Sequence, residues 1–335
     1  MAGSHKPFER VTISQVAEAA GVSRATVSRA FSRPHVLKAE TVARIRAVAQ
    51  TLGYAPNQTA RALSTGRHGN IAIIVPDVAN PFFPPLIRAA QEAAYEADYC
   101  VFLGNSDESG EREDGLVGRF AGQVEGLILA SSRLPEARIR ALAAMKPLVL
   151  VNRDVAGIPR VLIDTAGGAA DGVRHLVALG HRRIVYVTGP AASWSNEQRR
   201  IAVRRAAAAA GVEMVALPAV RPSFEAGRKA VAAILQSGAT AAIAFDDLTS
   251  QGVLAGLHER GLTAPDSLSL IGCDDVAGPM TWPPLSTISS RSREAGEIAV
   301  HILFDILRGR GVSDARYVLD TALVLRGTCG PPPQS

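Results

Sequence analysis

Short apolar runs alternate with amphipathic stretches over most of the chain after Gly69, and this alternation constrains the fold strongly. The runs have the length of buried strands, and the stretches between them repeat at helical spacing. Strands that alternate with helices form a mostly parallel sheet with helices on both faces. We therefore expect an α/β fold with strands at Ile71–Val75, Tyr99–Leu103, Gly126–Leu129, Leu148–Val151, Val161–Ile163, Ile184–Val187, Ala241–Phe245 and Leu268–Ile271.

Polar residues stand just after the carboxyl ends of these predicted strands. In an open α/β sheet, this edge is where ligands bind. The sequence therefore predicts a cleft with a polar floor, built from Asp77, Asn105, Ser131, Asn152, Asp164, Ser193, Asp246 and Asp274.

Positive charge is concentrated at the start of the chain. The net charge of the whole chain is +5, and the first 68 residues contain ten Lys or Arg residues against Glu9, Glu18 and Glu40. The first 68 residues thus carry 10 − 3 = +7, which leaves 5 − 7 = −2 for the rest. A basic module on an acidic body indicates a polyanionic partner for the module, although a solvated basic face is the alternative.

The basic module begins with two short helical patterns. Thr12-Ile13-Ser14-Gln15 matches a capping box, which predicts a helix from about Ile13 that ends at Gly21. Ser23 can cap a second helix from about Arg24 to Phe31. The inward-facing positions are Val16, Ala17, Ala20, Val22 and Val27. Two short helices with a tight turn are typical of a helix-turn-helix, whose second helix enters the major groove of DNA.

Three residues of the second helix occupy the positions that read DNA bases in this motif: Arg24, Ala25 and Arg29. Arginine can donate two hydrogen bonds to guanine, and alanine offers a methyl contact. The alternative is that both arginines contact phosphate, and Thr26 and Ser28 can contact either phosphate or a base.

A third helix is predicted from Ala39 to Leu52, and it closes a three-helix core. Its expected core positions are Val42, Ile45, Val48 and Leu52. Gly53 ends it, and the capped helical segment that follows, residues 54–63, is too short to be stable alone in water.

Five stretches of the chain resemble the LacI/GalR, or lactose-repressor, family of bacterial regulators: VTISQVAEAAGVSRATVSRAF, LGYAPNQTARALSTGR, IAIIVPDVANPFF, HLVALGHRRIVYVTGP and SLIGCDDV. The resemblance covers residues 11–328 in the family's order. It implies an all-α helix-turn-helix DNA-binding domain (10–56), a hinge helix (57–68) and a periplasmic-binding-protein-like type 1 domain (69–330) for ligand binding and dimerisation. The latter would consist of two Rossmann-like subdomains with parallel sheets, 69–164 with 291–315 and 165–290 with 316–330, so that the chain crosses near Thr165, Ser290 and Arg316.

The resemblance also implies which residues contact operator DNA. In the family the hinge helix folds on the operator, and a leucine matching Leu63 inserts into the minor groove, where an apolar wedge bends the duplex. The alternative is that Leu63 packs on the module itself. Lys38 stands where the family commonly has a serine cap, so the third helix could fray there or Lys38 could contact phosphate. The implied DNA-binding residues are Ser14, Ser23, Arg24, Ala25, Thr26, Ser28, Arg29, Asn57, Ala60 and Leu63.

For the cleft, the resemblance implies contacts to a small effector from Phe82, Phe83, Asn152, Ser193, Ser195, Arg199, Asp246 and Asp274. These types suit a hydroxyl-rich ligand, because carboxylates and amides pair with hydroxyl groups and aromatic faces cover C–H surface. A neutral sugar or polyol fits best. Phe82 and Phe83 could instead be core or subunit-interface residues. Pro222, Asp246 and Cys273 depart from frequent family residues and leave the ligand open.

Other classes of protein find less support. The chain lacks the motifs of serine hydrolases, P-loop enzymes, dinucleotide enzymes and zinc proteases, so we expect no enzyme and no cofactor. Three widely spaced cysteines and isolated histidines (His175, His181, His258) predict neither disulfides nor a metal site. A periplasmic-type binding protein and an architectural DNA binder with a vestigial cleft remain as alternatives.

Location and assembly follow from the same features. No apolar run is long enough for a membrane span, and the first residues lack the apolar run of a secretory signal, so we expect a cytoplasmic, nucleoid-associated protein without a membrane partner. One short recognition helix binds weakly, so a homodimer on pseudo-palindromic double-stranded operator DNA is expected. The chain ends in Gly-Pro-Pro-Pro-Gln-Ser, without a tetramerising heptad tail. Whether the effector induces or corepresses stays open.

Overall fold

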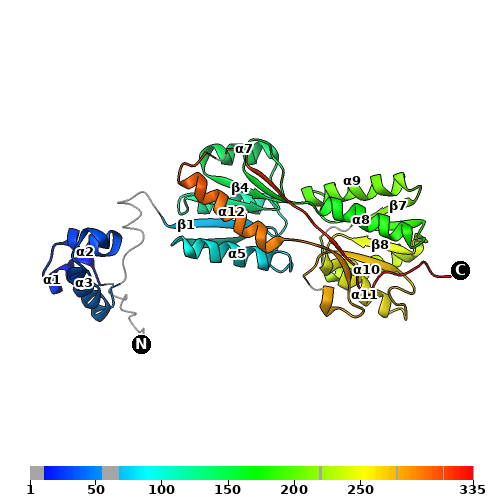
Figure 1. Ribbon diagram of the computed structural model, residues 1–335, viewed down its shortest axis with the longest axis horizontal. Coiled ribbons are helices and arrows are strands. Elements are labelled where there is room, and N and C mark those ends of the chain that lie inside the picture. The colour runs from blue at the N-terminus through cyan, green and yellow to red at the C-terminus, as the bar shows by residue number, and fades with distance from the viewer. Residues whose placement is uncertain (1–10, 55–67, 219–220, 277, 312, 335) are drawn as a thin grey trace, which may run out of the picture. The chain divides into compact units, whose positions relative to one another are not determined.

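The chain forms two compact units, Met1–His68 and Gly69–Ser335 (Figure 1). The computed structural model describes residues 11–54, 68–218, 221–276, 278–311 and 313–334. The described part of the first unit contains three α-helices and a short 3-10 turn: α1 (Ile13–Ala19), α2 (Arg24–Ser32), η1 (Pro34–Val36) and α3 (Ala39–Leu52). The predicted hinge segment 57–68 lies outside the described residues except for His68.

The core of the first unit lies between its three helices. Val16 and Val27 are completely buried, as the helical spacing predicts. On α3, Ile45 is also completely buried, but the expected core position Leu52 is 38% exposed. That prediction is wrong, because the buried stripe of α3 follows Val42, Ile45 and Ala49 and turns away from the core before the last residue.

The second unit consists of two six-stranded sheets with strand orders β11-β5-β4-β3-β1-β2 and β12-β10-β9-β8-β6-β7. Every pairing is parallel except that of β10 with β12. The strands are β1 (Asn70–Val75), β2 (Cys100–Asn105), β3 (Gly126–Ala130), β4 (Leu148–Val151), β5 (Arg160–Ile163), β6 (Arg183–Val187), β7 (Glu213–Leu217), β8 (Ala241–Ala244), β9 (Ser269–Asp274), β10 (Ser286–Ser289), β11 (Arg316–Leu319) and β12 (Leu323–Val324).

Helices cover both faces of each sheet, so the predicted fold class is confirmed (Figure 1). The first sheet packs α5 and α12 on one face and α6 and α7 on the other, whereas the second packs α8 and α9 opposite α10 and α11. The helices are α5 (Phe83–Glu96), α6 (Gly110–Phe120), α7 (Glu136–Met145), α8 (Thr165–Ala178), α9 (Trp194–Ala209), α10 (Phe224–Gln236), α11 (Asp247–His258) and α12 (Ser292–Leu307). None of the described helices is long and apolar enough to cross a membrane.

All eight predicted strands coincide or overlap with observed ones, whereas β7, β10, β11 and β12 were not predicted. β7 and β11 are edge strands whose residues are mostly exposed or half-buried, so their sequences lack a buried apolar run. β10 is buried but reads Ser-Thr-Ile-Ser, and β12 is only two residues long.

The chain passes between the two sheets three times. The passages follow β5 at Asp164, follow β10 at residues 290–291, and separate β11 from β12 at residues 320–322. The crossing expected near Arg316 is therefore wrong. Residues 316–319 pair with β5 and belong to the first subdomain, because this edge of the first sheet accepts one more parallel strand before the chain leaves it.

Candidate functional site

The caps that define α1 and α2 are the ones that the sequence predicts. The Thr12 backbone N–H donates to Gln15 Oε1 at 2.7 Å, and the Gln15 backbone N–H donates to Thr12 Oγ1 at 3.4 Å. Gly21 has a φ of +64°, and Ser23 Oγ accepts from the Thr26 backbone N–H at 3.2 Å. These local bonds fix the residue at which α2 begins, and therefore which of its side chains point outward.

The predicted DNA-reading residues lie together on the outer face of α2. Val27 and Ala30 are completely buried, and the exposed positions between and around them are Arg24, Ala25, Ser28 and Arg29. Ser14 and Ser23 are also exposed and Thr26 is half-buried. The remaining predicted contacts, Asn57, Ala60 and Leu63, lie outside the described residues. The described part of this unit thus presents two arginines, small polar groups and a methyl group on one helix.

Lys38 precedes α3 without giving it a side-chain cap. Its backbone is extended and its side chain is exposed, yet α3 begins at Ala39 as predicted. Helix packing, rather than a cap, therefore holds this end of α3.

In the second unit, a cavity lies between the carboxyl edges of the two sheets. Its lining residues are Asn80, Phe82, Phe83, Glu108, Ser131, Arg133, Asn152, Thr165, Ser193, Ser195, Arg199, Phe245 and Asp274. All the predicted ligand residues except Asp246 are among them. The cavity measures about 40 Å³, enough for a few water molecules, so a larger ligand requires the subdomains to separate.

Several residues in the cavity lining or next to it, as Asp246 is, also hold the ends of secondary-structure elements. Ser193 caps α9, and Asp246 caps α11 by accepting from the Thr249 backbone N–H at 2.8 Å. Asn152 follows β4 with a φ of +51°, and its Oδ1 accepts from the Ile163 backbone N–H at 3.0 Å. Because these side chains are fixed by the fold, the polar floor of the cavity is rigid.

Arg199 is the central cation of the floor. It extends from α9, is only 5% exposed, and its guanidinium lies 4.3 Å from the centroid of the Phe245 ring. Its Nη1 donates to the Phe245 backbone carbonyl, and its Nε donates to that of Ser195 at 3.3 Å. Both acceptors are neutral carbonyls, so no ion pair among the described residues neutralises the guanidinium charge. That charge therefore interacts electrostatically with the nearby carboxyl groups.

Two of those carboxyls, Asp246 and Asp274, belong to the predicted site. Burial raises the pKa of Asp274 well above its ordinary value and also raises that of Asp246, and Arg199 opposes both shifts. Asp274 ends β9 with a φ of +115°, a conformation that side chains rarely adopt. Strain of this kind is typical of functional positions.

The wall contributed by the first subdomain contains an ion pair that sequence reasoning missed. Arg133 Nε and Nη2 donate to the two carboxylate oxygens of Glu108 at 2.6 and 3.1 Å, and the two side chains are 5% and 15% exposed. Both residues follow the carboxyl ends of strands, β2 and β3, which was the available signal. The pair is electrically neutral and presents a planar polar edge to the cavity.

Among the described residues, polar contacts made by Asn80 and by Arg221 join the two subdomains across the cleft. Asn80, from the first subdomain, donates from Nδ2 to Asp246 Oδ2 at 2.9 Å in a buried bond. At the rim, Arg221 pairs with Asp77 at 3.2 Å and also with Asp107. The bond with Arg221 lowers the pKa of Asp107. These contacts define a closed arrangement of the subdomains.

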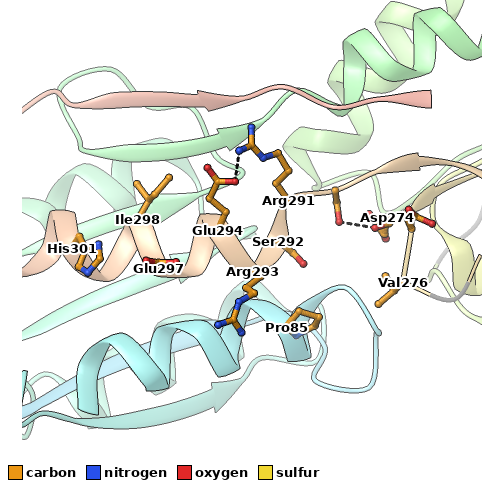
Figure 2. Close-up of a pocket in the computed structure, with 12 residues that line it drawn as sticks. Pro85, Asp274, Val276, Arg291, Ser292, Arg293, Glu294, Glu297, Ile298 and His301 are labelled. Atoms are coloured by element: carbon orange, nitrogen blue, oxygen red, sulfur yellow. Dashed lines mark hydrogen bonds and ion pairs between the residues drawn. The ribbon is translucent and has the colours of Figure 1, made fainter. Parts of the chain in front are cut away.

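A second groove, of about 710 Å³, follows the start of α12, and Figure 2 shows Asp274 at one end of it and His301 at the other. Asp274 lines both this groove and the cavity. Its backbone carbonyl accepts from the backbone N–H and Oγ of Ser290, at 3.2 and 2.8 Å. Ser290 lies at the second crossing, immediately before α12. A group that binds the Asp274 side chain is therefore linked to the hinge through the direct contact between Asp274 and Ser290.

The described residues include no group of His, Cys, Asp and Glu arranged to hold a metal ion. His181 is completely buried and bonds to Thr240 Oγ1 at 2.7 Å, to Ser269 Oγ at 3.1 Å and to the carbonyl of Gly330 at 3.0 Å. These contacts give His181 a structural role at the base of the second sheet.

Comparison with known proteins matches both units. Residues 12–57 match the model of bacterial regulatory proteins of the lacI family, and residues 173–329 match a periplasmic-binding-protein-like domain. The HTH-type transcriptional repressor CytR of Escherichia coli is 31% identical over 326 residues, covering 95% of this chain and 96% of CytR.

Two solved structures extend the comparison. The lac repressor dimer bound to operator and the anti-inducer ONPF has a TM-score of 0.86 at 27% identity, covering 96% of this chain and 99% of that one. The transcriptional regulator CelR in complex with cellobiose has a TM-score of 0.71 at 27% identity, covering 95% and 100%.

A helix-turn-helix unit followed by a two-lobed α/β domain with a cleft defines the class of bacterial transcription regulators built on a periplasmic-binding-protein-like domain. Within that class, the chain belongs to the lacI family of bacterial regulatory proteins.

Proposed function

We propose that this protein is a dimeric, sequence-specific transcriptional repressor that binds pseudo-palindromic operator DNA and is controlled by a small hydroxylated effector, a sugar or a polyol. Arg24 and Arg29 on the exposed face of α2 contact operator bases, while Ser14, Ser23, Thr26 and Ser28 position the unit on the backbone. It acts in the cytoplasm on nucleoid DNA and carries out no reaction of its own.

The observation that carries the effector response is the double position of Asp274. Its carboxyl lines the cavity, and its backbone carbonyl holds Ser290 at the hinge. An effector that binds the Asp274 side chain also changes the position of the crossing strand before α12. An effector whose contacts with Asp274 fit one arrangement of the cleft better than another shifts the population toward that arrangement.

The bonds across the cleft explain how the closed arrangement is stabilised in competition with an open one. Asn80–Asp246 and the Arg221 ion pairs stabilise the closed arrangement, and an effector stabilises whichever arrangement its own contacts fit better. A coupling free energy of about 1–3 kcal/mol changes operator affinity several-fold to about a hundredfold.

The described functions of similar proteins support the proposal. CytR is a transcriptional repressor, the lac repressor structure is a dimer on its operator, and CelR was solved with cellobiose. One short recognition helix gives weak binding alone, so a dimer that holds two half-sites accounts for useful affinity.

The test is selection of bound fragments from random and genomic DNA by the purified full chain, repeated with a panel of sugars and polyols. We expect an enriched pseudo-palindrome whose recovery changes with one compound. If no sequence is enriched at low salt, the repressor function is wrong and a ligand-binding protein with a basic arm is the better description. An enriched site that no compound affects refutes the effector part alone.

A further inference from the structure

Two consecutive aspartates at the start of α11 bind different parts of the molecule. Asp246 caps the helix and accepts from Asn80 Nδ2 of the first subdomain at 2.9 Å. Asp247 accepts from the Thr287 hydroxyl at 2.6 Å and from the Val276 backbone N–H at 3.0 Å. Both bonds of Asp247 lead away from α11, so this side chain connects the start of the helix to other segments of the second subdomain.

The bonds of Asp247 span the end of the strand that carries Asp274. Thr287 in β10 pairs with Gly272 in β9, and Val276 follows Asp274 by two residues. Asp247 Oδ1 lies over Gly272, where an added Cβ would collide with it. Asp247 is 2% exposed and Thr287 is completely buried, so water cannot replace a lost bond. The start of α11, the end of β9 and β10 are therefore held as one block.

This block reaches the second crossing between the subdomains. The Asp274 backbone carbonyl accepts from the backbone N–H and the hydroxyl of Ser290 at 3.2 and 2.8 Å. Ser290 follows Thr287 by three residues and lies immediately before α12. A continuous route of covalent and hydrogen bonds thus leads from Asn80, across the cleft, through the aspartate pair to the crossing. Such contiguous contacts can transmit a displacement between two sites.

A role in α11 alone does not account for Asp247. A carboxylate in the first turn of a helix interacts favourably with the helix dipole. An exposed acid provides that interaction without desolvation, as Glu225 does in the first turn of α10. Burying a carboxylate costs free energy that its new partners must offset. The burial of Asp247 therefore indicates that its bonds to Thr287 and Val276 matter.

We propose that Asp247 is a positioning residue whose bond with Thr287 makes the closure of the cleft at Asp246 and the crossing at Ser290 move together. Asp247 does not line the cavity, so it acts through its neighbours. The inference rests on the proposed function, because it names the route by which an occupied cleft moves α12. Without the bond, Asn80 still closes the cleft on Asp246, but the crossing no longer responds.

The experiment is hydrogen exchange of the full chain, measured by mass spectrometry in a double-mutant cycle. Asn80→Ala removes the buried bond across the cleft. The reporter is the segment 289–295, in which the Ser290 backbone N–H donates to the Asp274 carbonyl. With Thr287 intact, we expect Asn80→Ala to accelerate exchange in this segment about fivefold or more, because a lost bond to a buried carboxylate favours the open arrangement.

The second mutation of the cycle is Thr287→Val, which keeps the branched shape and removes the hydroxyl. In that background, Asn80→Ala should still accelerate exchange around Phe82, but it should cause no further change in the segment 289–295. Thr287→Ser keeps the hydroxyl and should restore the response of that segment. Loss of a merely structural bond would change the stability without removing the response.

Thr240→Val is the matched control. It removes a hydroxyl that bonds His181 at 2.7 Å in the same subdomain, away from the crossing, and the response to Asn80→Ala should persist in it. Circular dichroism and thermal melting show whether each variant is folded. If Thr287→Val does not fold, Asp247→Ala, which removes both bonds together with the buried charge, takes its place with the same expected result.

Each outcome decides the inference. If Asn80→Ala leaves the segment 289–295 unchanged with Thr287 intact, the cleft and the crossing are not coupled and the inference is wrong. If the full response persists in Thr287→Val, the coupling does not pass through Asp247 and the inference is also wrong. The measurement uses neither DNA nor an effector, so its failure leaves the operator selection as an independent test of the proposed function.

Discussion

Asn80 and Asp246, which are 166 residues apart in the sequence, join the two subdomains through a buried hydrogen bond of 2.9 Å from Nδ2 to Oδ2. Asn80 follows β1, and Asp246 caps α11, so the bond connects the carboxyl edges of both sheets. The same asparagine accepts from the Phe82 backbone N–H through Oδ1 at 3.0 Å. One side chain thus holds both the cleft and the loop that carries a predicted ligand residue.

Asn80→Ala should favour the open cleft. It removes a bond to a buried carboxylate, which costs the closed form about 1–3 kcal/mol. Hydrogen exchange measured by mass spectrometry should show faster exchange in the segments around Phe82 and Thr249. Asn70→Ala, which removes a bond to the Gln123 carbonyl away from the cleft, is the control. Unchanged exchange in Asn80→Ala would contradict a role for the bond in closure.

Asp274→Asn should change how stability depends on pH. The folded pKa of Asp274 is raised by burial, with Asp247 and Asp246 adding to the shift and Arg199 opposing it. A raised folded pKa means that the native state binds the proton more tightly, so the free energy of unfolding falls as pH rises from 3.8 toward the folded pKa. The variant should therefore melt several degrees higher than the wild type at neutral pH and equally near pH 3.8. Asparagine also tolerates the positive φ of this position better than most residues. If the melting temperatures of the variant and of the wild type differ by the same amount at every pH, the expected shift is refuted.

Gly252→Ala should destabilise the second subdomain. An added Cβ would lie 1.9 Å from the backbone carbonyl of Phe224, where α10 and α11 pack closely. Overpacking against backbone costs about 1–3 kcal/mol or more, measured by urea unfolding. Gly118→Ala is the matched control, because this glycine of α6 is exposed with nothing within 4 Å. The control should gain about 1 kcal/mol from helix propensity. Equal stabilities for both variants would show that the two helices can separate freely.

Arg29→Ala should weaken binding to the selected operator by about 1–3 kcal/mol and relax the base preference at one position of each half-site. Fluorescence anisotropy with matched and single-base-changed operators, at several salt concentrations, measures both effects. Lys38→Ala removes an exposed cation with no assigned base and serves for comparison. If Arg29 contacts phosphate instead, affinity falls equally for every sequence and the salt dependence decreases by about one charge.

The helix-turn-helix could be predicted from sequence because its determinants are local. The Thr12–Gln15 capping box and the Ser23–Thr26 bond join residues three apart, and Gly21 supplies its positive φ by itself. The buried strands were equally readable, since a run such as Leu148–Val151 is apolar throughout when both faces of a sheet are covered. The resemblance to known regulators then supplied most of the cavity residues, which the fold brings together.

The missed features depend on contacts between distant residues. Arg316–Leu319 is a strand only because β5 offers it a sheet edge, and Glu108 meets Arg133 only because β2 and β3 end at the same edge. Neither the strand pairing nor the ion pair produces a periodic pattern in the sequence around the residues involved.

The sequence by itself determined where the three helices of the first unit begin and where eight of the strands of the second unit lie, because capping and burial patterns act over a few neighbouring residues. Only the tertiary structure decided that Asn80 closes the cleft on Asp246 and that Asp274 touches both the cavity and Ser290 at the hinge. Those relationships arise when two sheets, each formed from separate stretches of chain, turn their carboxyl edges toward each other.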